Sequence, residues 1–184
     1  TPLWKATLHD VKIFRQMYIN GKRAQRAASQ NQVTGNRWVA GDFSDRDGIA
    51  ISPANLPDLS RPQDLELHWI YDWKDMRLLV EDIVINPDGT KTVWMKQPYY
   101  EFALRMEQSG SGHYWIPKYN VPFYLENAYE FLDEPGEWYF NPDTQELFYM
   151  PEDGEDMNTA DVIIPQTQNL LEITGGIVGD EVHN

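Results

Sequence analysis

Four histidines are among the residues in this sequence that could do chemistry. They are His9, His68, His113 and His183, and no two of them form a His-x-His or His-Glu-x-x-His pattern. A zinc site needs about three nitrogen, sulfur or oxygen ligands that converge on one point. The spacing predicts no such convergence, so we interpret the four histidines as unrelated and expect no zinc site.

Carboxylates are concentrated in the loop 151–156. This loop holds Glu152, Asp153, Glu155 and Asp156. Ca²⁺ takes about six to eight oxygen ligands, and an acidic loop can supply several of them, but the spacing does not follow the alternating pattern of an EF-hand. We therefore favour a solvated acidic loop and keep a calcium site at these four residues as the alternative. No other metal or cofactor is expected.

Paired carboxylates could also hydrolyse a glycosidic bond. That reaction needs two acidic side chains about 5–10 Å apart, one of them with a raised pKa. The chain has 29 Asp and Glu residues, so pairs occur by chance and nothing distinguishes one of them. The chain also has no Cys and no Gly-x-Ser-x-Gly motif, hence no thiol nucleophile and no nucleophile elbow. We assign no catalytic residue.

Aromatic residues are the most suggestive feature for binding, at 13% of the chain. Aromatic rings beside carboxylates suit a neutral sugar, but rings also fill sheet cores and pair across strands. We assign most of them to the core. The exception is His113, Tyr114 and Trp115, which follow the Ser- and Gly-containing residues 108–112. Functional side chains are concentrated on loops, so these three are candidate ligand contacts.

Strand signals dominate the elements that must position these groups. Residues 13–19 and 22–27 flank Asn20-Gly21. Asn-Gly between two such runs predicts a hairpin, because both central residues of a type I′ turn need φ > 0. Further hairpins are expected at 79–85 with 90–95 and at 137–140 with 146–150, and further strands at 1–4, 49–51, 65–71, 162–164 and 170–174. This spacing of short strands predicts a mainly β fold, an antiparallel β-sandwich.

One short helix is also expected. Leu125, Ala128, Tyr129 and Leu132 fall at i, i+3, i+4 and i+7, which is one face of a helix. The Pro-Gly pair at 135–136 would end it. The sequence thus predicts a β-sandwich with about one short helix.

Charge is distributed unevenly along the chain. The net charge is −14, all 15 Lys and Arg lie in residues 1–118, and residues 119–184 hold 15 of the 29 acidic residues. Nucleic-acid binding needs Lys and Arg to displace counterions, so we expect no nucleic-acid partner. We expect no membrane partner either, because the charge disfavours an anionic surface and no apolar run is long enough to span. The length suits one domain, placed at residues 1–184.

The first hairpin carries a small basic patch of Arg15, Lys22, Arg23 and Arg26. Opposite charges attract more strongly the more they are shielded from water. We interpret the patch as an intramolecular partner for the acidic residues 119–184 rather than as an anion-binding site.

Most of the chain resembles a region of large bacterial right-handed parallel β-helix proteins. The stretches that carry the resemblance are FRQMYINGKRAQRA (14–27), LELHW (65–69) followed by Trp73, Arg77 and Val80, FYLENAYEFLDEPGEWYF (123–140) and LFYMP (147–151). The first stretch departs from the family pattern, because Ala28 stands where relatives have a second Arg after the alanine. That departure weakens an anion-binding role for this strand.

The resemblance implies a β-sandwich inserted between an N-terminal β-helical start and the main β-helix. Relatives include glycoside hydrolases of the α-L-fucosidase, xylanase and β-xylosidase kinds, which act on plant polysaccharides. Their catalytic carboxylates lie on β-helix coils after this stretch, and this sequence has no such coil, so no catalytic residue is carried over. The resemblance also implies a periplasmic or secreted location.

Our leading hypothesis is a non-catalytic β-sandwich domain of a β-helix polysaccharide-degrading parent. It would brace the β-helix and could line a sugar cleft. Its expected partners are the β-helix portion of the same parent and a plant or bacterial polysaccharide. The alternatives are an autonomous carbohydrate-binding module and a small glycosidase with its own carboxylate pair. Candidate sugar contacts are Trp73, Arg77, His113, Tyr114 and Trp115.

Two expectations concern the chain as a whole. We expect the sequence to be a piece of a longer protein. The acidic residues 119–184 should then face solvent or dock on a basic patch of the missing β-helix, since uncompensated carboxylates are not buried without partners.

Overall fold

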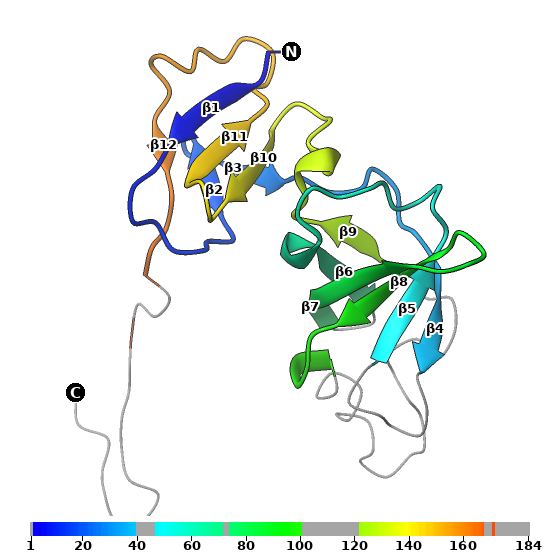
Figure 1. Ribbon diagram of the computed structural model, residues 1–184. Coiled ribbons are helices and arrows are strands. Elements are labelled where there is room, and N and C mark those ends of the chain that lie inside the picture. Colours follow the sequence, from blue (N-terminus) through cyan, green and yellow to red (C-terminus); the bar gives the residue numbers. More distant parts are fainter. Residues whose placement is uncertain (1, 40–46, 72–73, 101–121, 168–170, 172–184) are drawn as a thin grey trace, which may run out of the picture.

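The computed structural model describes residues 2–39, 47–71, 74–100, 122–167 and 171, which form two six-stranded sheets (Figure 1). The first sheet has the order β1 (Trp4–Thr7), β11 (Glu146–Tyr149), β10 (Glu137–Asn141), β3 (Lys22–Arg26), β2 (Met17–Ile19) and β12 (Val162–Ile163). The second has the order β4 (Gly35–Val39), β5 (Asp47–Ile51), β8 (Lys91–Met95), β7 (Lys74–Ile85), β6 (Glu66–Tyr71) and β9 (Tyr124–Glu126). Strands β3 and β10 pair in parallel, and the other strand pairs of the described residues are antiparallel.

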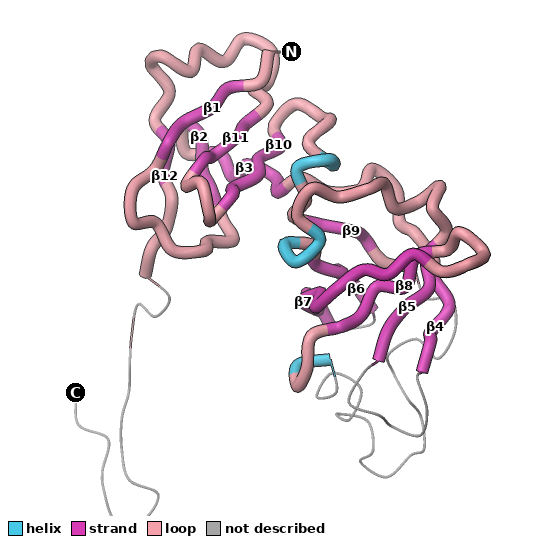
Figure 2. The backbone as a smooth tube through the Cα atoms, viewed as in Figure 1, coloured by secondary structure: helices cyan, strands magenta, loops and turns pink. Residues whose placement is uncertain are grey.

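The mainly β prediction is confirmed, and the two curled sheets are consistent with a β-sandwich. The first sheet is built from both ends of the chain, whereas the second comes from the middle (Figure 2). The chain that leaves β3 pairs with the segment of β9, through bridges of Ala28 with Glu126 and of Val33 with Phe123. Hydrogen bonds from the Val33 N–H to the Phe123 carbonyl (2.8 Å) and from the Phe123 N–H back (3.0 Å) close this link. Backbone pairing therefore ties one sheet to the other.

The described residues form two apolar cores, one centred on each sheet. In the first, Phe14 stacks on Trp138 with ring centroids 4.8 Å apart, and Met17, Phe140 and Tyr149 are buried beside them. In the second, successive side chains of β6 point to opposite faces. Leu67 and Trp69 accordingly fill the core, with Leu65 just before the strand, and all three are fully buried as the alternation predicts.

The predicted hairpins are confirmed. Asn20 and Gly21 both have positive φ, at 51° and 79°, as a type I′ turn requires. The second and third hairpins are β7–β8 and β10–β11. The strand before Asn20 is shorter than predicted, because regular pairing covers only Met17–Ile19. Of the other predicted strands, 170–174 lies largely outside the described residues.

The predicted helix around Leu125 is wrong. Leu125 lies in β9, where it pairs with Leu67 of β6, and only Tyr129–Phe131 forms a short 3-10 helix. Asn127, between the two elements, has φ of 65°, outside the right-handed helical region. The apolar spacing is satisfied by burial along a strand and a turn, so tertiary pairing overrides the helical pattern.

Two further elements lie within the described structure. Strand β4 was not predicted from the sequence. A second 3-10 helix, η1 (Pro62–Asp64), lies between β5 and β6. Within the part of the chain that the structure describes, no helix has the length and apolarity that a membrane crossing requires.

Candidate functional site

A cleft of about 880 Å³ is lined by residues of both sheets. Its walls include Arg15, Arg23 and Arg26 from the first hairpin and His68, Arg77 and Glu126 from the second sheet. Both sets are mostly charged, whereas small-molecule sites are mostly apolar with few polar groups. The cleft therefore has the character of an ionic site.

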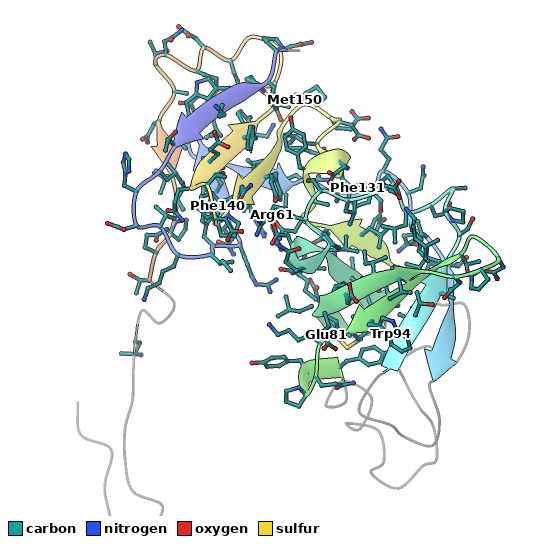
Figure 3. The ribbon with its side chains drawn as sticks, viewed as in Figure 1. Arg61, Glu81, Trp94, Phe131, Phe140 and Met150 are labelled. Carbon is teal, nitrogen blue, oxygen red and sulfur yellow. The ribbon has the colours of Figure 1, made fainter. Side chains whose placement is uncertain are left out.

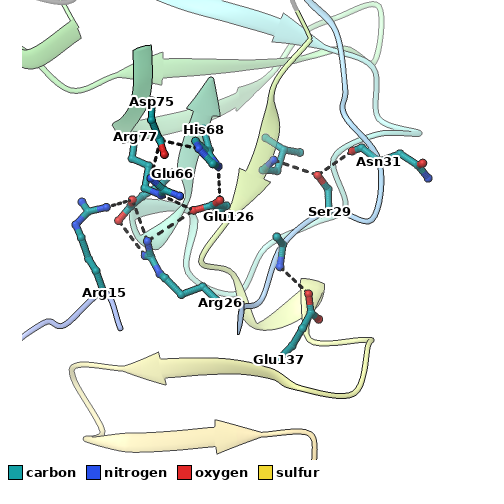
Figure 4. Close-up of polar contacts among 12 residues, drawn as sticks. Arg15, Arg26, Ser29, Asn31, Glu66, His68, Asp75, Arg77, Glu126 and Glu137 are labelled. Atoms are coloured by element: carbon teal, nitrogen blue, oxygen red, sulfur yellow. Dashed lines mark hydrogen bonds and ion pairs between the residues drawn. The ribbon is translucent and has the colours of Figure 1, made fainter. Parts of the chain in front are cut away.

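Glu66 forms the buried centre of this site. Its carboxylate accepts bonds from Arg26 Nη1 (3.2 Å) and Nη2 (3.0 Å) and from Arg15 Nη1 (2.5 Å) (Figure 4). Because Glu66 alternates with Leu65 and Leu67, it points to the face of β6 opposite the core. That face is normally solvated, but here the arginines of the first sheet cover it.

His68 lies two residues further along the same face. Its Nδ1 lies 2.5 Å from Glu126 Oε1, and its Nε2 lies 2.8 Å from Asp75 Oδ1. Only a doubly protonated ring can donate to both carboxylates. Arg77 contacts the same two acids, through Nε to Glu126 (3.0 Å) and Nη1 to Asp75 (2.7 Å). The two side chains fix the Glu126 carboxylate from one side, and Arg26 Nη1 lies 3.8 Å from it on the other.

Two carboxyl groups at the cleft have shifted pKa values in opposite directions. Burial alone would raise the pKa of Glu66, but the hydrogen bonds and charges of Arg26 and Arg15 outweigh it and hold that pKa below 4.5. Burial raises the pKa of Glu137, although its carboxylate accepts backbone N–H bonds from Ala28, Asp133 and Glu134. Glu66 is therefore an ionised partner of arginine, and Glu137 holds a turn together.

These contacts determine whether the carboxylates of the cleft could act as a glycosidase pair. A glycosidase pair needs one acid with a raised pKa that is free to protonate the leaving oxygen. Glu66 has the opposite shift, and Glu126 is held by Arg26, His68 and Arg77. Glu137 has the raised pKa, but its oxygens accept backbone hydrogen bonds. The described cleft thus has the chemistry of an ion-pair network rather than of an acid and a nucleophile.

The sequence comparison identifies the family. The family model of the GH141 insertion domain matches residues 3–152. The chain belongs to the GH141 insertion-domain family. This confirms the coarser part of the resemblance, a domain inserted into a glycoside hydrolase.

One solved structure has a similar fold. It is titled "Glycoside hydrolase", has a TM-score of 0.65 and 24% sequence identity, and the alignment covers 89% of this chain and 29% of that chain. The insertion domain therefore spans less than a third of that protein's length. No curated protein matches the sequence.

Of the sugar contacts predicted for the insertion domain, Arg77 is the one within the described residues, and it lines the cleft. Trp73, His113, Tyr114 and Trp115 lie outside the described residues. Sequence reasoning missed Glu66, His68 and Glu126. A signal was present, because Glu66 and His68 alternate with Leu and Trp inside an apolar run, but its meaning depended on partners from another sheet.

The acidic loop after β11 is largely engaged by its own domain. Glu152 accepts from Lys22 Nζ with both oxygens (2.5 and 2.7 Å), and Glu155 accepts from the Tyr149 hydroxyl (2.7 Å). Asp156 accepts from the Asn158 N–H and side-chain amide. Within the described ranges, no three His, Asp or Glu side chains are grouped as metal ligands would be. A calcium site at this loop stays a prediction.

The intramolecular interpretation of the basic patch, as a partner of residues 119–184, is supported at two of its four positions. Lys22 contacts Glu152, and Arg26 lies near Glu126, both in the acidic part of the chain. Arg15 instead contacts Glu66, which lies outside that part. Arg23 has no ion-pair or hydrogen-bond partner among the described residues.

Proposed function

We propose that this insertion domain is a non-catalytic brace of a glycoside hydrolase built on a right-handed parallel β-helix. The family match supports the enzyme context. The observation that carries the bracing role is the arginine–glutamate cluster, defined as Arg15, Arg26, Glu66 and Glu126. It fixes the two sheets relative to each other through ion pairs with Glu66 that are 2.5–3.0 Å long.

A rigid two-sheet unit can transmit contacts made at one sheet to the other. Buried ion pairs make the relative position of two elements specific even where they add little net stability. The backbone link between β3 and β9 limits movement in the same way. We propose that residues 1–184 act as one domain, in a parent of the α-L-fucosidase, xylanase or β-xylosidase kind that is exported from a bacterial cell.

The test is an activity assay of the 184-residue chain. Aryl-glycosides and oligosaccharides of pectin and xylan are incubated with the chain, and released sugar is measured against buffer. We expect no hydrolysis above buffer. Turnover that survives repurification and is lost in a Glu137→Gln variant would overturn the non-catalytic assignment.

The β-helix context and the bracing role have separate tests. For the context, the parent protein should contain β-helix coils after residue 184. For bracing, removing residues 3–152 from the parent should lower its thermal stability while leaving the catalytic carboxylates in place. A parent whose melting temperature is unchanged by this deletion would contradict bracing.

A further inference from the structure

Arg23 is the basic residue of the first hairpin that the ion-pair network leaves unused. It lies on β3, is exposed and lines the cleft. Its neighbours Lys22 and Arg26 each have a carboxylate partner, whereas Arg23 has none among the described residues. An arginine guanidinium is always charged and presents five N–H donors in a rigid fork that matches a carboxylate. The unused fork points to an anionic ligand rather than to an internal partner.

Two more arginines present donors to the same cleft. Arg15 is half exposed and uses Nη1 alone in its bond to Glu66. Arg77 uses Nε and Nη1, which leaves Nη2 without a described bond. Both guanidiniums are already held by carboxylates, so a ligand that binds them would not have to order them first. Figure 4 shows Arg15 and Arg77 on different sides of the Glu66 and Glu126 carboxylates.

Uncharged groups in the cleft could contact the hydroxyls of a sugar that also carries an anionic group. Gln25 and Tyr124 line it, and they offer an amide and a half-buried ring that carries a hydroxyl. Ser29 lines it too, but its hydroxyl already donates to the Asn31 carbonyl and accepts from the Leu125 N–H. Amides and hydroxyls can both donate to and accept from sugar hydroxyls. The volume of about 880 Å³ is within the range of small-molecule sites. A bare inorganic anion would use the arginines and leave these groups unused.

The net charge of the whole chain can be compared with the charge of the cleft. With a net charge of −14, the domain repels anions on average. The cleft lining holds four arginines, Arg15, Arg23, Arg26 and Arg77, against three glutamates, Glu126, Glu134 and Glu137, which is a formal charge of +1 from Arg and Glu. The lining is therefore less negative than the chain as a whole, and a local difference of this kind favours an anion at the cleft over the rest of the surface.

We propose that the cleft between the two sheets binds a carboxylate-bearing saccharide, a uronate, with its carboxylate on Arg23 and with Arg15 and Arg77 beside it. The inference rests on the proposed function, because it gives the insertion domain a substrate class that it would hold for the parent enzyme. Binding here requires no catalytic group of this chain.

The test compares three probes that separate the chemistry. Digalacturonate carries the carboxylates, galactobiose is its neutral counterpart, and inorganic phosphate is an anion without a sugar. Binding to the 184-residue chain is measured by titration calorimetry at about 50 and 300 mM NaCl. We expect digalacturonate to bind and to weaken several-fold at the higher salt, because exposed charges are screened. Galactobiose and phosphate should bind at least about tenfold more weakly.

Two substitutions test whether digalacturonate binds at Arg23. Arg23→Gln should weaken digalacturonate binding at least about tenfold, since a charge-assisted bidentate contact is lost. The matched control is Lys96→Gln, which removes one exposed positive charge that does not line the cleft; it should bind as the wild type does. Arg23 has no described partner, so its replacement should not affect folding, which a thermal melt checks.

Each other outcome overturns the inference. Absence of digalacturonate binding, equal binding of galactobiose, equal binding of phosphate, or an equal loss in Arg23→Gln and Lys96→Gln would each do so. None of these results affects the proposed function, which fails only if the chain hydrolyses sugars or does not brace its parent.

Discussion

Besides the backbone link between β3 and β9, two side-chain contacts of different kinds join the two sheets. At the cleft, the arginine–glutamate cluster joins them with charges. Elsewhere, the Tyr139 hydroxyl of β10 donates to Asp64 (2.7 Å), which also accepts from Arg61 Nε (2.6 Å). Arg61 lies between the sheets and reaches Asp143 of the β10–β11 turn as well (Figure 3). We call this second group the tyrosine–aspartate contact.

The two contacts differ in what surrounds them, aromatic rings in one case and an open cleft in the other. Around the tyrosine–aspartate contact, the rings of Tyr129, Tyr139 and Phe148 pack together, with centroids of 5.1 Å between Tyr129 and Phe148. Beside the arginine–glutamate cluster, the rings of His68 and Tyr124 are 6.2 Å apart, and the cluster opens into the cleft. The tyrosine–aspartate contact is thus supported by apolar burial, whereas the cluster depends on charge balance and leaves donors available.

Glu66→Gln should have the largest effect on this comparison. It leaves Arg26, whose side chain is 7% exposed, without its main counter-charge. Removing one partner of a buried pair costs about 3–5 kcal/mol, and we expect about 3 kcal/mol because Glu126 stays 3.8 Å away. Urea unfolding measures the change, and the control is Glu81→Gln, an exposed position on β7. A loss no larger than that of the control would show that the cluster does not fix the sheets.

Tyr139→Phe tests the second contact and should have a smaller effect. It removes the hydroxyl from Asp64 but keeps the ring in its packing and leaves Arg61 as partner of Asp64. A hydrogen bond to a charged group contributes about 1.5–3 kcal/mol, and we expect a loss near the low end. Tyr129→Phe is the control, because the Tyr129 hydroxyl has no hydrogen bond within the described structure while its ring is in the same cluster. Equal losses in both variants would assign the effect to the rings.

Acid pH should weaken the arginine–glutamate cluster selectively. Since the pKa of Glu66 is lowered in the folded state, its contribution to stability is complete above about pH 4.5 and is lost as the pH falls through the lower, folded-state pKa. The raised pKa of Glu137 acts in the opposite sense, because protonating it as the pH falls towards 4.5 favours the folded state.

A comparison of variants isolates the Glu66 contribution. The stability difference between wild type and Glu66→Gln should be constant near neutral pH and should shrink below about pH 4.5, because the substitution mimics the protonated acid. Urea unfolding at several pH values between about 3 and 7 measures this. A difference that stays constant throughout would contradict the lowered pKa.

The sequence predicted the turns and the core face better than the contacts between sheets. The turn at Asn20-Gly21 depends on those two residues, and the alternation of Leu65, Leu67 and Trp69 depends on one short segment. Both could be predicted because neither requires a partner from elsewhere in the chain. Glu66 and His68 on the other face would be expected to meet solvent, and their burial depends on Arg26 and Glu126, which are far away in the sequence. The same non-local pairing turned the predicted helix at Leu125 into a strand. Arg77 was reached only through the resemblance, since nothing in its local sequence marks a cleft.

Lys22→Gln should have the smallest effect and calibrates the others. Lys22 pairs with Glu152 at distances as short as those in the cluster, 2.5 and 2.7 Å, but the side chains are 67% and 40% exposed. An exposed pair is screened by water and salt, so we expect a loss of at most about 0.5 kcal/mol that vanishes at high salt. Urea unfolding at two NaCl concentrations measures it beside Glu66→Gln. If the two substitutions cost the same, distance rather than burial would govern these ion pairs, and the distinction between the cluster and the protein surface would not hold.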